Sequence, residues 1–213
     1  MQSNSSLIDQ SSRSFIEIAR RAQIIQCAIL TIAELGYTQA SLAKIAKRAG
    51  ISAGVISYYF AGKDDLITEV AAHVYEAGER FIRARLAPNQ SARATLRAFI
   101  EANVAYFGDH PANVIAVMNI VRSGRTGIGG GANDAALGEP RRAAIGAILE
   151  RGQASGEFRV FAIPVMVATL IEALGVIPPQ LAATPDLDTD AYGRELAELF
   201  DRATRKDPVG DLS

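Results

Sequence analysis

The sequence predicts an all-α fold, in which an N-terminal three-helix module with a helix-turn-helix precedes a longer helical body. Three observations support this prediction. Apolar residues recur at the three- and four-residue steps of amphipathic helices along most of the 213 residues. Each of these helical stretches is followed by glycine or proline, which end helices. No stretch keeps the two-residue alternation of a half-buried strand for long.

The composition indicates a soluble protein of a reducing compartment. Apolar residues make up 49% of the chain, which is enough for a sizeable core. Cys27 is the single cysteine, and no Cys/His cluster has the spacing of a zinc site, so we expect a cytoplasmic protein without metal. Residues 1–14 are polar and lack a signal-peptide core, so we expect a disordered tail there and a second tail over residues 206–213.

The charge of the chain is unevenly distributed. Residues 1–63 hold seven Lys or Arg against three acids, a balance of +4, and the whole chain carries −1, which leaves −5 for the remainder. A basic module on an acidic body can contact phosphates locally while the body avoids non-specific adhesion to nucleic acid.

The first predicted domain, residues 15–65, opens with a helix that ends at Gly36. We expect this helix to be the scaffold of the domain. Its apolar stripe consists of Phe15, Ile18, Ala19, Ala22, Ile25, Ile29, Ile32 and Ala33.

Two short helical patterns within residues 41–63 are separated by a tight turn over residues 49–52. Gly50 can take the left-handed conformation that ends the first helix, and Ser52 can cap the second by accepting a backbone N–H. This is the pattern of a helix-turn-helix. The first helix has an apolar face, formed by Leu42, Ile45, Ala46 and Ala49, and a basic flank, formed by Lys44, Lys47 and Arg48.

Several residues of this stretch match a known family at their spacing. They are Ser41, the pair Ile45 and Ala46, the run 49–52, Gly54, the aromatic residues Tyr58, Tyr59 and Phe60, and Lys63 followed by Asp64, Asp65 and Leu66. The stretch resembles the tetracycline-repressor family of transcriptional regulators, over residues 15–70. The resemblance implies an all-α homodimer that binds a double-stranded DNA operator and responds to a small-molecule effector.

The resemblance also implies which residues contact DNA. They are Ser41, Lys44, Ser52, Ala53, Val55, Ser57, Tyr58, Tyr59 and Lys63. The positions that face bases are mostly small, so methyl contacts from Val55 and Ala53 and readout of DNA shape are favoured over bidentate hydrogen bonds. Lys63, with the two tyrosines, is expected at phosphates, since it begins a helix whose dipole favours an anion.

Other roles stay open for these residues. Ser41 can act as a helix cap alone, Lys44 as a solvated charge and Ser57 as part of a packed helix surface. One of the two tyrosines can turn into the core, where we also expect Phe60, packed on the first helix.

The second predicted domain, residues 66–205, is a helical body for effector binding and dimerisation. Five residues border the expected cavity, although each can also be ordinary core or surface: Asn103, Tyr106, Met118, Asn119 and Arg122. The chain has no Trp, which argues against a tryptophan-walled cage for a quaternary ammonium ligand. The expected helices cover residues 63–86, 91–108, 112–122, 139–155, 163–177 and 189–205.

Two segments of the body allow other interpretations. The glycine-rich residues 123–133 lack the preceding strand and the Lys-Ser/Thr pair of a phosphate-binding loop, so we expect a flexible loop. Residues 160–177 are apolar almost all round but are broken by Pro164 and Glu172, and a helix buried in the protein or in an oligomer is favoured over a membrane span. In the family that the chain resembles, the last two helices form a four-helix dimer interface.

Catalysis is the remaining alternative. Tyr59 and Lys63 have the spacing of a short-chain dehydrogenase pair, but the N-terminal third has no strand followed by a dinucleotide-binding glycine fingerprint. We therefore expect a regulator rather than an enzyme, without a cofactor and without a membrane partner, and a repressor rather than an activator of a palindromic operator. The alternative is a helical ligand-binding or interaction protein without sequence-specific operator reading.

Overall fold

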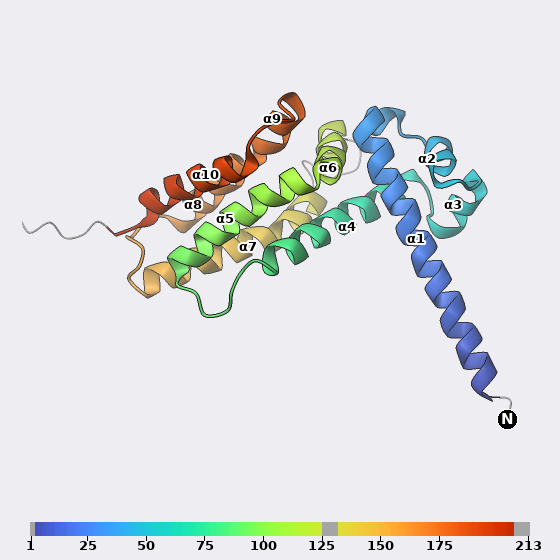
Figure 1. The fold of residues 1–213 in the computed structure, drawn as a ribbon, viewed down its shortest axis with the longest axis horizontal. Helices are drawn as coiled ribbons and strands as arrows, with labels where there is room; N and C mark the ends of the chain where they lie inside the picture. The colour runs from blue at the N-terminus through green and yellow to red at the C-terminus, as the bar shows by residue number, and fades with distance from the viewer. Residues whose placement is uncertain (1–2, 125–131, 207–213) are drawn as a thin grey trace, which may run out of the picture.

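The computed structural model describes residues 3–124 and 132–206, and within them the fold is helical apart from one isolated bridge between Phe158 and Arg205. The all-α prediction is confirmed. Figure 1 shows α1, α2 and α3 at one end of the molecule and the other helices extending away from them. The helices of the described residues are α1 (Ser3–Gln39), α2 (Leu42–Ala49), α3 (Ala53–Tyr59), α4 (Lys63–Arg83), α5 (Ala92–Asp109), α6 (Pro111–Ser123), α7 (Ala132–Ala154), α8 (Ile163–Gly175), α9 (Ile177–Ala183) and α10 (Thr189–Thr204).

The first helix begins earlier than the sequence predicts. α1 starts at Ser3, so the backbone of residues 3–14 is helical where we expected a disordered tail. That segment contains neither Pro nor Gly, and nothing in it interrupts a helix. Gly36 has φ 77° and ψ 163°, which ends the regular helix at the predicted residue. Of the tail predicted at the other end of the chain, residues 207–213 lie outside the described residues.

The apolar stripe of α1 is buried only in its C-terminal half. Ile25, Ile29 and Ile32 are buried, whereas Phe15 and Ile18 are 73% and 65% exposed. The reason is visible in Figure 1, where the N-terminal half of α1 projects beyond the helices that could cover it. The scaffold role expected of this helix therefore belongs to its C-terminal half.

Two apolar cores lie along the molecule, and α4 contributes to both. Leu66 and Val70, in the first half of α4, belong to the core that holds α1, α2 and α3 together. Phe81 and Ile82, in its second half, pack against the core of the body. Because α4 runs through residue 65 without a break, the predicted domain boundary there stays a prediction.

The body departs from the predicted helices in two places. α8 ends at Gly175, and a short helix that we did not predict, α9, follows it. Pro178 and Pro179 fall in the first turn of α9, where a missing N–H costs no helical hydrogen bond. α7 begins at Ala132 and continues through Pro140, so the flexible loop predicted over residues 123–133 is shorter, and residues 125–131 of it lie outside the described residues.

One segment, Ile163–Ala183, is long and apolar enough to cross a membrane by length and composition alone. The structure divides this segment at Val176 into α8 and α9. Leu170, Leu174 and Ile177 are buried in the core of the body. Because 28% of the apolar window is buried in the single chain, the interpretation favoured from the sequence, a helix buried in the protein or in an oligomer, stays a prediction.

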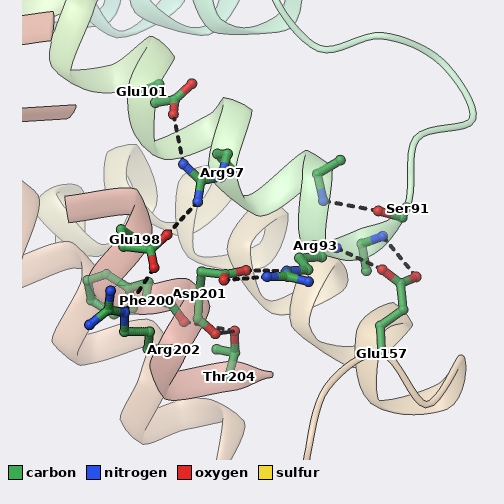
Figure 2. A network of polar contacts seen from close by, with 12 residues as sticks. Ser91, Arg93, Arg97, Glu101, Glu157, Glu198, Phe200, Asp201, Arg202 and Thr204 are labelled. Carbon is green, nitrogen blue, oxygen red and sulfur yellow. Dashed lines mark hydrogen bonds and ion pairs between the residues drawn. The ribbon is translucent and has the colours of Figure 1, made fainter. Parts of the chain in front are cut away.

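A network of ion pairs fastens α10 to α5 (Figure 2). Arg93 donates to both carboxylate oxygens of Asp201, and Arg97 donates to Glu198 at 2.8 Å. Glu157, in the turn before α8, accepts two backbone N–H groups from the first turn of α5 at 3.1 and 3.0 Å. These contacts join three segments that are far apart in the sequence.

Candidate functional site

The turn between α2 and α3 has the geometry that the sequence predicts, with one exception. Ser41 caps α2 by accepting the N–H of Lys44 at 3.3 Å, and Gly50 lies in the left-handed region with φ 67° and ψ 30°. Ser52 stands at the N-cap of α3, but its side chain accepts no capping hydrogen bond, and that part of the prediction is wrong. The first turn is closed by the main chain instead, since the N–H of Val55 donates to the carbonyl of Ser52 at 3.1 Å.

The helix-turn-helix brings most of the predicted DNA-binding residues to its surface. Ser41, Lys44, Ser52, Ala53, Ser57 and Tyr58 are exposed, and Val55, Tyr59 and Lys63 are half-buried. The hydroxyl of Ser57 donates to the carbonyl of Ala53 at 3.3 Å within α3. The side chains are therefore small and weakly polar at the positions where bases are expected. The cations lie at the edge of this surface.

The adjacent aromatic residues point in different directions. Tyr58 is 74% exposed, while Tyr59 packs against the first core and Phe60 is buried in it. Arg21 of α1 lies 4.4 Å from the centre of the Phe60 ring and donates to the carbonyl of Tyr59 at 2.7 Å. It also pairs with Glu69 of α4 at 3.1 Å. Arg21 thus joins α1, the end of α3 and α4, a role that the sequence analysis missed.

Lys63, the predicted phosphate contact, stands at the first position of α4. Its amine donates to the carbonyl of Tyr37 at 2.7 Å and lies 4.2 Å above the ring of the same residue. This places a cation at the junction of α1 and α4, beside the N-terminus of a helix. A phosphate contact at Lys63 stays a prediction.

A cavity of about 760 Å³ lies in the body, between α4, α5, α6, α7, α8 and α9. Four of the five predicted ligand-binding residues line it: Asn103, Tyr106, Met118 and Arg122. Its walls are largely apolar, and they include Phe99, Phe107, Val114, Ile148 and Leu174. A volume of this size, with few polar groups, is typical of small-molecule sites.

Asn119, the fifth predicted residue, does not line the cavity. Its side-chain amide donates to the carbonyl of Ile32 in α1 at 3.0 Å, so the prediction for Asn119 is wrong. The reason is the helical period: Met118 and Arg122 are four residues apart and share the face of α6 toward the cavity, whereas Asn119 turns toward α1.

Arg141 also lines the cavity and is not among the residues predicted from the sequence. One of its terminal nitrogens donates to the side-chain oxygen of Asn103, and its Nε is buried with no acceptor among the described residues. Burial lowers the pKa of Arg141 from its ordinary value. Burial likewise raises the pKa of Tyr106, whose hydroxyl donates to the carbonyl of Val74 at 3.1 Å. Among the described residues, no group of three His, Cys, Asp or Glu could hold a metal ion.

Comparison with known proteins assigns a family to the helix-turn-helix end of the chain. Residues 24–70 match the family model of the bacterial regulatory proteins of the tetR family, and they contain α2, α3 and the turn between them. Over these residues the chain matches the tetR family. The resemblance on which the sequence analysis relied is thereby confirmed.

The relatives in sequence support the same assignment over part of the chain. The chain is 42% identical over 85 residues to the HTH-type transcriptional regulator BetI 1 of Chromohalobacter salexigens. The match covers 39% of this chain and 42% of that relative. The chain therefore matches less than half the length of this curated relative.

Solved structures show that the fold extends over nearly the whole chain. A bacterial regulatory protein of the tetR family from Rhodococcus RHA1 superposes with a TM-score of 0.75 at 18% identity, covering 89% of this chain and 98% of its own. FadR of Bacillus subtilis, solved in complex with stearoyl-CoA, superposes with a TM-score of 0.71 at 22% identity, covering 84% and 96%. At these identities the likeness concerns the fold alone.

Proposed function

We propose that this protein is a ligand-responsive transcriptional regulator of the tetR family, which binds a palindromic double-stranded DNA operator as a homodimer and represses the adjacent gene from the cytoplasm. α2 and α3 would read the operator, and the cavity of the body would hold a small-molecule effector. The proposed DNA contacts are Ser41, Lys44, Ser52, Ala53, Val55, Ser57, Tyr58, Tyr59 and Lys63. The proposed effector contacts are Asn103, Tyr106, Met118 and Arg122.

One observation supports a link between the cavity and the helix-turn-helix: α6 lines the cavity and also packs in the core that holds α1. Val117 and Met118 line the cavity, while Ala116 and Ile120 are buried in the core that also holds α1. The amide of Asn119 adds a direct hydrogen bond from α6 to α1. A ligand that prefers one position of α6 would therefore also favour one position of α1, and with it one placement of the helix-turn-helix.

The proposed homodimer explains the apolar surface near the C-terminal end. Val165 of α8 is 65% exposed and Leu199 of α10 is 59% exposed. An open groove of about 770 Å³ runs beside Leu199, and Tyr192 and Leu196 also line it. Apolar surface of this kind is typical of contacts between subunits.

The dimer would turn effector binding into release of DNA. Two identical helix-turn-helix motifs read half-sites that lie about one helical turn, or a multiple of it, apart. An effector that favours a different separation of the two motifs lowers the affinity for the operator. Removal of the repressor would then open the promoter to polymerase.

A second function, a helical ligand-binding or interaction protein, is motivated by the small residues at Ala53 and Ser57, which offer few hydrogen bonds to bases. Selection of bound sequences from randomised duplex DNA separates the two functions. The proposal predicts an enriched inverted repeat whose affinity exceeds that of random duplex at physiological salt. Weak binding without an enriched sequence, which disappears as salt is raised, would favour the second function.

Light scattering of the same samples measures the oligomeric state. The proposal predicts twice the mass of one chain for the wild type. Leu199→Glu, which puts a charge on the exposed apolar face of α10, should give the mass of one chain. Arg194→Ala, a change to an exposed residue of the same helix that does not line the groove, serves as the control. A wild type that is monomeric at micromolar concentration would contradict the dimer.

A further inference from the structure

The cavity has a charged group at its wall, Arg141, that no ion pair among the described residues neutralises. We propose, on the basis that this cavity is the effector site of the proposed function, that its ligand is an amphipathic anion: an alkyl chain with a carboxylate or phosphate head that pairs with Arg141. The apolar walls would hold the chain, and the guanidinium of Arg141 would hold the head.

Arg141 is placed as a receptor for an acidic group. A guanidinium has five N–H donors, and the described contacts use one nitrogen, on the side-chain oxygen of Asn103. The Nε is buried and has no acceptor within the part of the chain that the structure describes. The ring of Phe107 is 5.9 Å from the guanidinium carbon. A buried donor without an acceptor is destabilising, and more so when it is charged, so an anion that accepts from Arg141 would bind favourably there.

Asn103 fixes Arg141 without neutralising it. Its amide nitrogen donates to the carbonyl of Phe99 at 2.7 Å, which leaves its oxygen directed at Arg141. Asn103 itself is 1% exposed, so this hydrogen bond is shielded from solvent. An amide carries no charge, and none of the ion pairs among the described residues includes Arg141. Within the part of the chain that the structure describes, the guanidinium is therefore held in place by a neutral partner.

The other charged residues of the cavity strengthen the preference for an anion. The lining contains four arginines and one glutamate, Glu79, which pairs with Arg83 at 3.6 Å. Arg151 donates to the hydroxyl of Thr95 at 2.8 Å, again a neutral partner. The surplus of positive charge opposes a cationic ligand and favours an anionic one.

The shape of the cavity fits a chain rather than a compact ion. Asn103, at the Arg141 end, and Thr95, at the Arg151 end, are eight residues apart on α5, a distance of about 12 Å along the helix. Phe99 lies between them on the same wall. Arg151 is exposed, while Arg141 has its Nε buried, so the deeper end of the cavity is the one at Arg141. A ligand that enters head first reaches Arg141 and leaves its apolar chain against this wall.

Four probes with the same alkyl chain and different heads test the proposal by calorimetry: decanoate, decyl phosphate, decanol and decyltrimethylammonium. We expect at least one of the two anions to bind tenfold or more tightly than both decanol and the cation. The better anion identifies a carboxylate or a phosphate head. Equal affinities for the anions and decanol, tighter binding of the cation, or no binding of any probe would overturn the proposal.

Variants of Arg141 test whether this residue causes the preference for an anionic head. Arg141→Gln should lower the affinity for the better anion to that of decanol and leave the affinity for decanol unchanged, whereas Arg141→Lys should keep part of the preference. Arg142→Gln, at an exposed neighbour that does not line the cavity, is the matched control and should bind as the wild type does. An anion preference that survives Arg141→Gln would overturn the assignment.

Thermal unfolding gives a readout that does not depend on calorimetry. The anion should raise the unfolding temperature of the wild type and not that of Arg141→Gln, while decanol should raise both equally. Equal anion-induced shifts in the two proteins would contradict the proposal. None of these measurements involves DNA, so a protein that fails to select an operator can still bind the anion, and the two proposals fail separately.

Discussion

The hydroxyl of Tyr106 in α5 donates to the carbonyl of Val74 in α4 at 3.1 Å, beside the cavity. The same hydroxyl accepts from the side-chain amide of Asn113 in α6 at 3.1 Å. The hydroxyl of Tyr106 therefore joins α4, α5 and α6. Both α4 and α6 also contribute to the core that holds α1, α2 and α3 together. This arrangement makes Tyr106 the described side chain best placed to pass a change in the cavity to the helix-turn-helix.

Tyr106→Phe should weaken that transmission while keeping the ring that packs in the body. We expect the factor by which a bound alkyl anion changes operator affinity to shrink toward one, because the variant loses the hydrogen bonds to α4 and α6. Fluorescence anisotropy of a labelled operator, with and without the anion, measures this factor. An unchanged factor would show that the coupling does not pass through the hydroxyl.

Two substitutions separate the proposed roles in DNA binding. Lys63→Ala should weaken binding to all sequences and flatten its dependence on salt, because it removes a proposed phosphate contact. Val55→Ala should reduce the preference at one thymine and leave the salt dependence as it is, since it removes an apolar contact to a methyl group. Titration of specific and random duplexes at several salt concentrations measures both. Equal losses on specific and random DNA for both variants would contradict these roles.

Lys63 needs one further check, because its amine also holds Tyr37. The unfolding temperature of Lys63→Ala shows whether reduced DNA binding comes from a loosened junction of α1 and α4. Lys47→Ala is the comparison. Lys47 is an exposed cation on α2, and no hydrogen bond of its amine to another helix is described.

Acid should destabilise the contacts that hold α10 and the α7–α8 turn to α5. The hydrogen bond from Arg93 holds the pKa of Asp201 below its ordinary 3.8, and backbone N–H groups of Arg93 and Ala92 hold the pKa of Glu157 below 4.5. Both carboxyl groups therefore bind protons less readily in the folded state. Their stabilising effect is complete above these ordinary values and is lost as the pH falls through the lower values of the folded protein. Urea unfolding between pH 6 and pH 3 measures this loss.

Arg93→Met tests the same contact at neutral pH. We expect a free energy of unfolding lower by about 1–2 kcal/mol, because Asp201 is left buried and unpaired while half of the Arg93 side chain is exposed to solvent. The pH dependence of stability should also become shallower below pH 5. Arg80→Met removes the exposed pair with Glu76 and should change little. A variant of Arg93 as stable as that of Arg80 would contradict the role of the buried ion pair.

Glycine at position 152 of α7 is required by a neighbour, while glycine at position 146 of the same helix is not. A Cβ at Gly152 would overlap the ring of Phe158, which is buried against α7, whereas nothing lies within 4 Å of a Cβ at Gly146. Gly152→Ala should lower the free energy of unfolding by about 1–3 kcal/mol. Gly146→Ala should leave it unchanged or raise it by up to about 1 kcal/mol, as alanine favours a helix. Urea unfolding of both variants measures the difference, and equal stabilities would contradict this packing.

The helix-turn-helix could be predicted from the sequence because its signals are local. Ser41 caps α2 three residues away, and Gly50 ends it within one turn. Arg21 and Arg141 could not be predicted, since each makes its defining hydrogen bond to a residue 38 positions away in the sequence. From the sequence alone, an arginine in an ordinary helical pattern is interpreted as a solvated charge, because only the tertiary structure shows whether packing buries it.

The body illustrates the same limit. The sequence predicts correctly that Met118 and Arg122 line the cavity. It also predicts Asn119 there, whereas the side chain of Asn119 is on the side of α6 that faces away from the cavity. Helix periodicity defines a face, and only the neighbours decide what that face meets. The single helix predicted over residues 163–177 is followed in the structure by α9, whose first turn contains Pro178 and Pro179.

The most direct test of the account is the dissociation constant of the selected inverted-repeat duplex, measured with the cavity empty and with the best-binding alkyl anion at saturation. The account predicts tight, sequence-specific binding without the anion and at least tenfold weaker binding with it. An operator affinity that stays the same while calorimetry shows the cavity filled would contradict the coupling of the two sites through α6.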